Sequence, residues 1–178
     1  MFNFGRIIKY PMNKLIQQIT SFVLPVLVLI VIPLLIVKEI AIKSTPAFIA
    51  GIILVIIGLS AMAVTISGFI RIGRGTLAPW SPTKKLVFNG MYAYVRNPMI
   101  MGVLITLLGE SLSILSRPIL IFAAIFFIVN QVWFLFYEEP DLEKKFGDEY
   151  RNYKKNVPRW IPRMKPYSPG SDDQAVNQ

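Results

Sequence analysis

The sequence contains neither cysteine nor histidine, and this double absence limits the chemistry that the chain can support. Without cysteine there is no disulfide, no thiolate nucleophile and no cysteine metal site. Without histidine the chain lacks the commonest metal ligand and the commonest general base. These absences weigh against most hydrolase mechanisms, and we expect no bound metal.

Charge is also scarce: charged residues make up 16% of the 178 residues, whereas hydrophobic residues make up 54%. A soluble domain of this length carries more charge, and here the apolar residues stand in long blocks, which predicts a membrane protein. The net charge is +9, but the cations cluster in loops between apolar runs. No recognition motif accompanies them, so we expect no nucleic-acid partner.

Four apolar runs predict an all-α, polytopic membrane protein with about four transmembrane helices. The runs cover residues 19–37, 47–70, 98–114 and 119–137. The first is longer than the apolar part of a signal peptide and lacks a small-residue cleavage site, so it is interpreted as a retained span. We expect Pro25 and Pro33 to kink it. The third and fourth runs are short for full spans, which allows local bilayer thinning or a tilted hairpin.

The loops predict the orientation of these spans. The connection 71–97 contains arginines and lysines but no acidic residue. By the positive-inside rule, this connection and both termini face the cytoplasm, at the inner or plasma membrane if the source is bacterial. Small residues in the second run, among them Gly51 and Gly58, predict close packing against another helix.

Hydrophobic residues recur at helical spacing after the last apolar run. They are Leu142, Phe146, Tyr150, Tyr153 and Val157. This spacing predicts a cytoplasmic C-terminal amphipathic helix that lies on the membrane face and covers the connection 71–97. Trp160 follows as an interfacial anchor, and residues 164–178 are expected to form a disordered tail.

Two adjacent carboxylates, Glu138 and Glu139, follow directly on the fourth apolar run, where charge is costly. The polar segment 92–98 precedes the third run at the same face. The pair is either a solvated helix end or a site for a polar, partly cationic ligand that serves a lipid-embedded substrate. Tyr92 and Tyr94 either face such a cation or belong to an interfacial aromatic belt.

Three polar residues lie inside the apolar runs. Glu110 is a candidate functional residue because acids are costly in a membrane, or else it meets the far interface or Arg117. Asn130 and Gln131 either line a substrate cavity or form hydrogen bonds between helices.

Three segments, 86–102, 138–139 and 146–158, together resemble the isoprenylcysteine carboxyl methyltransferase family. That family belongs with the phospholipid methyltransferases among the integral-membrane S-adenosylmethionine enzymes. The resemblance covers residues 74–163. The family usually has Arg-His-Pro-x-Tyr-x-Gly where this chain has Arg96-Asn97-Pro98-Met99-Ile100-Met101-Gly102. Asn97 thus replaces a histidine, and Ile100 replaces a tyrosine.

The resemblance implies that S-adenosylmethionine is the cofactor and that Glu138 binds its polar end. The implied cofactor-binding residues are Lys84, Lys85, Leu86, Val87, Tyr92, Asn97, Pro98, Met99, Ile100, Glu138 and Glu139. The amide of Asn97 can bond to a cofactor carboxylate but cannot titrate near neutral pH. Methyl transfer is an in-line displacement that needs no metal, and a carboxylate acceptor needs no base. No catalytic residue is therefore assigned.

The resemblance also implies a lipid-like or prenylated acceptor. In the prenylcysteine enzymes an arginine four residues before the cofactor-binding glutamate meets the substrate, and Phe134 occupies that place here. Arg151 and Arg159 are candidates to replace it, or the acceptor is a different amphiphile. The alternative function is a non-catalytic membrane scaffold or assembly protein that retains the fold.

The chain is accordingly expected to have three parts. Residues 1–70 form an N-terminal transmembrane helix pair. Residues 71–163 form the methyltransferase region, with the cofactor-binding loop, a helical hairpin and the amphipathic helix. Residues 164–178 form the tail.

Overall fold

The computed structural model describes residues 23–73 and 86–169, and every regular element in these two ranges is helical. The elements in chain order are η2 (Leu27–Val31), α2 (Ile32–Ile36), α3 (Thr45–Gly73), η3 (Gly90–Ala93), α4 (Pro98–Ser113), α5 (Arg117–Trp133), η4 (Phe134–Glu138), α6 (Glu139–Phe146) and α7 (Asp148–Asn156). The all-α class predicted from the sequence is confirmed.

Among the described residues, two helices are long and apolar enough to cross a membrane. One is Thr45–Gly68 within α3, and the other is Arg117–Phe146, in which α5, η4 and α6 form one continuous helix. Only 17% of the apolar window of each is buried inside the molecule, whereas the core helix of a soluble protein is mostly buried. The helices Val23–Ile36 and Pro98–Ser113 are apolar but shorter. Four complete spans and cytoplasmic termini stay predictions, and residues 19–22 of the first run lie outside the described residues.

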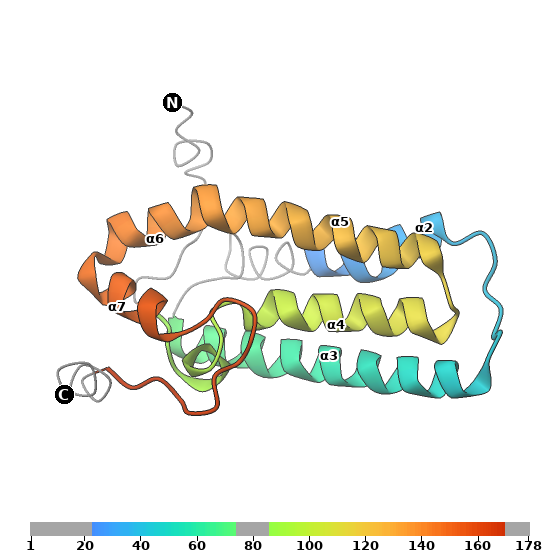
Figure 1. Ribbon diagram of the computed structural model, residues 1–178, viewed down its shortest axis with the longest axis horizontal. Helices are drawn as coiled ribbons and strands as arrows, with labels where there is room; N and C mark the ends of the chain where they lie inside the picture. The colour runs from blue at the N-terminus through green and yellow to red at the C-terminus, as the bar shows by residue number, and fades with distance from the viewer. Residues whose placement is uncertain (1–22, 74–85, 170–178) are drawn as a thin grey trace.

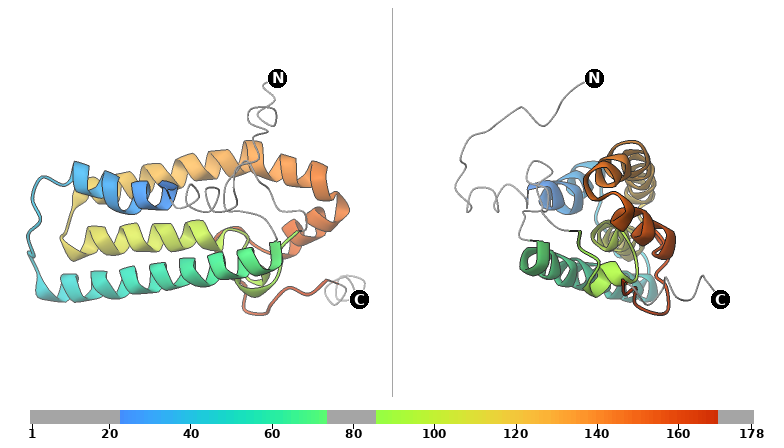
Figure 2. Two further views of the ribbon diagram at one scale, coloured as in Figure 1. Left: turned by 180° about the vertical axis from the view of Figure 1, so that it is seen from behind. Right: turned by 90° about the vertical axis from the view of Figure 1, so that its left-hand side faces the viewer.

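The helices form an elongated bundle in which α4 lies between α3 and α5 (Figure 1, Figure 2). Helix α4 is antiparallel to both neighbours. At one end of the bundle the segment 86–97 meets α6, α7 and residues 157–169, which we call the C-terminal segment (Figure 1). At the other end α4 turns into α5, and the segment after α2 leads into α3. The core between the helices consists of Met62, Val103, Leu107, Ile119 and Ala123.

Glycines allow α3 and α4 to approach closely. A methyl group at Gly51 would lie 2.5 Å from the backbone nitrogen of Ser113 and 2.6 Å from the carbonyl oxygen of Gly109. A methyl group at Gly109 would lie 2.7 Å from the carbonyl oxygen of Gly51. These contacts confirm the close packing predicted from the small residues.

Two π-helical turns precede prolines in this bundle. The turn η2 (Leu27–Val31) precedes Pro33, and η4 (Phe134–Glu138) precedes Pro140. A proline ring conflicts with the carbonyl four residues earlier, and a locally wider turn relieves that conflict without ending the helix. The disturbance expected at Pro33 therefore takes the form of a π turn, and the second π turn carries Glu138.

The single amphipathic helix predicted after residue 138 is wrong as one continuous element. Helix α6 ends at Phe146, Gly147 adopts a φ of +56°, and α7 begins at Asp148. Glycine tolerates this backbone conformation because it has no Cβ. The apolar residues still gather in one cluster, which contains Leu142, Phe146, Tyr150, Tyr153, Val157, Tyr167, Leu86 and Phe88. Their position on a membrane surface stays a prediction.

The tail boundary predicted at residue 164 is too early. Tyr167 is buried in the cluster around α7, and its ring centroid lies 5.7 Å from that of Tyr153. Its backbone nitrogen donates to the carbonyl of Ala93 at 2.9 Å. Residues 170–178 lie outside the described residues.

The close contact between α3 and α4 predicts opposite effects for the same substitution at two glycines of α3. Gly51→Ala should cost about 1–3 kcal/mol, because its methyl group meets backbone atoms of α4. Gly68→Ala is the matched control, since no atom of the described residues lies within 4 Å of a methyl group there. It should be neutral or stabilise the helix by up to about 1 kcal/mol. Thermal unfolding in detergent measures both, and equal effects would contradict the packing.

Candidate functional site

The C-terminal segment lies along the segment that leads into α4. The backbone nitrogen of Arg96 donates to the carbonyl of Pro158 at 3.0 Å. In the other direction, the backbone nitrogen of Arg163 donates to the carbonyl of Tyr94 at 3.0 Å. These bonds bring the N-terminus of α4 next to the region that follows α7, and they define the end of the bundle at which the candidate site lies.

The side chain of Glu139 lies at the centre of this end and binds three cations. Its Oε1 accepts from Arg96 Nη1 at 2.7 Å and from Arg159 Nε and Nη2 at 2.9 and 2.6 Å. Its Oε2 pairs with Lys154 Nζ at 3.1 Å. The residue is only 6% exposed, so the pairs are shielded from water. Glu139 thus connects α6, α7, the C-terminal segment and the approach to α4.

Sequence reasoning missed this cluster. Arg96 precedes Glu139 by 43 residues, and the separation follows no local period. The only available indication was chemical, because the polar segment 92–98 and the acidic pair were both expected at one membrane face. That pattern did not indicate whether Glu138 or Glu139 would pair with the cations.

The neighbouring carboxylate of Glu138 is placed differently. Consecutive residues of a helix point about 100° apart, so the two acids do not share a face. Glu138 is half-buried, and among the described residues its carboxylate makes no ion pair or hydrogen bond. It lies near Tyr92: burial raises the pKa of the Tyr92 phenol, and the charge of Glu138 adds to that rise. Within the described residues, Glu139 is thus paired with cations and Glu138 is not.

The tyrosines of this end act as neutral groups. Tyr153 donates its hydroxyl proton to the backbone carbonyl of Tyr92 at 2.8 Å, and burial raises its pKa. Burial and the Glu139 charge raise the pKa of Tyr150 to about 12, against the opposing effect of Arg96. The phenols of Tyr92, Tyr150 and Tyr153 all stay protonated at neutral pH, so none of them is a general base in the resting protein.

Asn97 occupies the position before the first turn of α4. Asparagine at this position commonly caps the helix through its side chain, but here the side chain makes no capping hydrogen bond. Pro98 begins the helix, where its missing N–H costs nothing, and it is buried. Met99 and Ile100 follow in the first turn and are half-buried. The Asn97 amide is thus not used by the helix that it precedes.

The structure describes two of the four remaining residues that were predicted to bind the cofactor. Val87 is buried, and Leu86 packs against the cluster around Tyr150 and Tyr153. Lys84 and Lys85 lie outside the described residues. The structure therefore brings the segment from Leu86 to Ile100 and the acidic pair to the same end of the bundle.

Phe134, the residue in the place of the substrate-binding arginine, lies under the C-terminal segment. The ring centroid of Trp160 is 6.1 Å from that of Phe134 and 5.1 Å from that of Phe127. Trp160 Nε1 also donates to Gln131 Oε1 at 2.7 Å, so this glutamine forms a tertiary hydrogen bond. Asn130 instead donates to the carbonyl of Phe126 in its own helix. Trp160 therefore attaches the C-terminal segment to α5.

The two arginines predicted to meet the substrate are not brought together. Arg159 pairs with Glu139, next to Trp160. Arg151 is exposed on α7 and pairs with Asp148 at 2.8 Å. A role of either arginine in substrate binding stays a prediction.

Comparison with known proteins places this end of the bundle inside a family match. The model of the phospholipid methyltransferase family matches residues 46–149, which is more than half of the chain and includes Asn97, Glu138 and Glu139. No solved structure matches the chain.

Two relatives match shorter stretches. Over 86 residues, or 47% of the chain, the sequence is 33% identical to the methanethiol S-methyltransferase of Pseudomonas deceptionensis. That match spans only 30% of the length of the Pseudomonas protein. Over 54 residues, or 30% of the chain, it is 44% identical to an uncharacterized protein of Haemophilus influenzae, of which it covers 76%.

The cation cluster predicts a large difference in stability between two glutamates of α6. Glu139→Gln leaves Arg96 and Arg159 buried without a counter-charge, which should cost about 3–5 kcal/mol. Glu143→Gln, whose pairs at 3.8 and 4.0 Å are more exposed, should cost about 1 kcal/mol or less. Thermal unfolding in detergent compares them, and a Glu139→Gln variant as stable as the control would show that the cluster is not structural.

Proposed function

This chain belongs to the phospholipid methyltransferase family, and on that basis we propose that it uses S-adenosylmethionine to methylate a lipid-like acceptor at the cytoplasmic membrane face. Membership of the family and the two apolar helices among the described residues support a membrane methyltransferase. The cofactor, the acceptor and the orientation belong to the proposal.

One observation carries the proposed cofactor site. Of two adjacent carboxylates, Glu139 is bound by three cations and Glu138 makes no ion pair or hydrogen bond with the described residues. The Arg96–Glu139 contact joins the two segments that carry Asn97 and Glu138. Half-burial of an acid without a partner is unfavourable, which supports a ligand at Glu138.

The donors and acceptors present fit the polar part of S-adenosylmethionine. The Glu138 carboxylate accepts hydrogen bonds from an amino group or a ribose diol. The Asn97 amide bonds to a carboxylate, and the Tyr92 ring faces a sulfonium through cation–π attraction. We assign the first turn of α4, Pro98 to Ile100, together with Leu86 and Val87, to the walls of the cofactor site. Glu139 takes part by holding these segments in place.

Bound S-adenosylmethionine supplies an activated methyl group, and the chain has to position the acceptor in line with it. Neither Tyr150 nor Tyr153 removes a proton at neutral pH, so the proton that an amine or thiol acceptor loses on methylation passes to water at the membrane face. Trp160 and Phe134 make the adjoining surface apolar, so they suit the hydrocarbon part of an acceptor that enters from the bilayer.

The pairing of the arginines favours an acceptor without a carboxylate. Arg96 and Arg159 are committed to Glu139, and Phe134 cannot pair with an anion. An amine or an uncharged amphiphile therefore fits better than a prenylcysteine carboxylate. One relative is named for methylation of the sulfur of methanethiol, so a thiol on an apolar group is the second acceptor class.

The proposed cofactor site predicts that Glu138→Gln weakens S-adenosylmethionine binding by about 1.5–3 kcal/mol, the value of a charge-assisted hydrogen bond. That loss is roughly 10- to 150-fold in Kd. Glu143→Gln, on the same continuous helix but with its carboxylate in exposed ion pairs, should bind normally. Calorimetry on purified protein measures both. Equal, negligible losses would mean that Glu138 is a solvated helix end, and no binding by the unmodified protein would favour the non-catalytic scaffold.

The pairing of Arg96 and Arg159 predicts the acceptor preference. With methyl-labelled cofactor, the unmodified protein should methylate a single-chain amine or thiol at least about tenfold faster than a farnesyl-cysteine analogue, because an unpaired buried carboxylate is penalised. Product analysis of reactions in bilayers measures the three rates side by side. Efficient methylation of the carboxylate would show that another cation meets the acceptor.

A further inference from the structure

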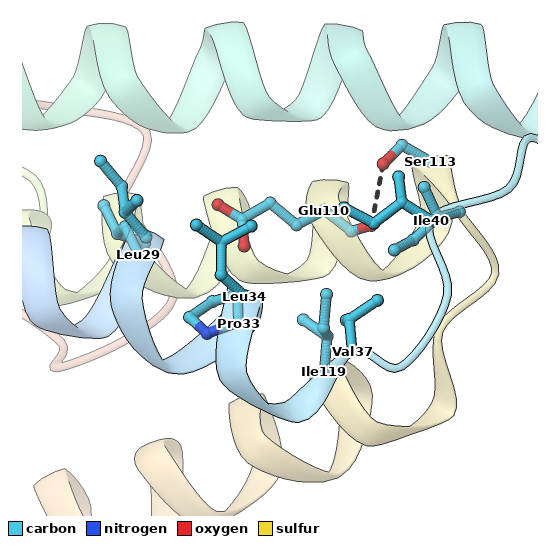
Figure 3. A pocket seen from close by; sticks show the side chains of 10 residues that line it. Leu29, Pro33, Leu34, Val37, Ile40, Glu110, Ser113 and Ile119 are labelled. Carbon is cyan, nitrogen blue, oxygen red and sulfur yellow. Dashed lines mark hydrogen bonds between the residues drawn. The ribbon is translucent and has the colours of Figure 1, made fainter.

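A groove lies at the opposite end of the bundle from Glu138. It has a volume of about 250 Å³ and lies between the helix Val23–Ile36, the segment after it, the end of α4 and the start of α5. Apolar side chains dominate its lining, chiefly Leu29, Pro33, Leu34, Val37, Ile114 and Ile119 (Figure 3). Glu110 is the single ionisable residue among those that line it.

Among the described residues, the carboxylate of Glu110 has no hydrogen-bond or ion-pair partner. Its Oε2 is buried and makes no hydrogen bond with the described residues. Ser113, about one turn further along the helix, donates to the backbone carbonyl of Glu110 at 2.8 Å and not to the carboxylate (Figure 3). No ion pair joins Glu110 to Arg117, which was one of its two expected roles. A buried acid oxygen in an apolar groove is unfavourable unless a donor meets it.

The groove is open to an occupant from the bilayer. Ile30, Leu34 and Ile40 belong to its lining and are 52%, 59% and 68% exposed. The volume is below the 300–1,000 Å³ that encloses a drug-sized ligand, so it suits the polar end and first methylenes of a chain. The rest of such a chain would continue along the exposed apolar surface of the helix Val23–Ile36.

We propose that this groove is a second ligand site, which binds the ammonium end of a single-chain amphiphile by pairing it with Glu110. The carboxylate selects a cationic donor over an anion, and the apolar lining selects a hydrocarbon chain. The site is separate from the methyl-transfer end, because Glu110 lies about three helical turns along α4 from Pro98. It is independent of the proposed function.

Thermal unfolding in an uncharged detergent, without S-adenosylmethionine, tests the site with octylamine, octanol and octanoate at equal concentration. A ligand that binds the folded state raises the unfolding midpoint. At ten times its Kd, octylamine should raise it by about 3–6 °C. Octanol should raise it less, and octanoate should not raise it. Equal shifts for octylamine and octanol would overturn the proposed pairing with Glu110.

Glu110→Gln should weaken octylamine binding at least tenfold and so remove most of the shift. Glu39→Gln is the matched control, because it lies at the same end of the bundle, is exposed and is outside the groove. It should keep the full shift. Without ligand, Glu110→Gln should unfold at the same or a higher temperature, because it removes an unpaired acid.

Two results would overturn the proposal: an octylamine shift retained by Glu110→Gln, or a lowered midpoint of that variant without ligand. The second would mean that the carboxylate already has an internal partner. Because no cofactor is present, either failure leaves the methyltransferase proposal untouched.

Discussion

The position of the candidate site depends on one buried carboxylate. Taking the charge of Glu139 out of water is unfavourable, and Arg96, Arg159 and Lys154 offset that cost together. Each cation comes from a different part of the chain, so the carboxylate fixes the approach to α4, helix α7 and the C-terminal segment relative to one another. The placement of Trp160 over Phe134 follows, because Trp160 is next to Arg159 in sequence.

The same geometry explains why two adjacent acids have different roles. The π turn at Phe134–Glu138 and the 100° rotation between neighbouring residues aim Glu139 at the cations and Glu138 away from them. The carboxylate of Glu139 is paired with the cations that connect these segments, and the carboxylate of Glu138 is half-buried beside Tyr92. A ligand site next to a rigid ion cluster gains a fixed geometry without itself contributing to folding.

The bundle beneath the site is held by a different kind of contact. Apolar side chains cover the outside of both long helices, so burial of hydrocarbon from water cannot drive their association within a bilayer. Close contact of the α3 and α4 backbones at Gly51 and Gly109 supplies van der Waals attraction instead. This packing carries the site at one end of the bundle and the Glu110 groove at the other.

The sequence by itself determined the helical class, the positions of the apolar helices, the close packing at the small residues and the family, because these depend on local period, run length and short motifs. Only the tertiary structure decided which acid of the pair binds the cations, that Gly147 divides the amphipathic segment, and that Gln131 holds Trp160. The break at Gly147 lets α7 fold back, and the arginine–Glu139 bonds and the Trp160 contact then join residues 20 to 43 positions apart. Such pairings are chosen by burial and geometry in the assembled molecule, and a one-dimensional pattern does not specify them.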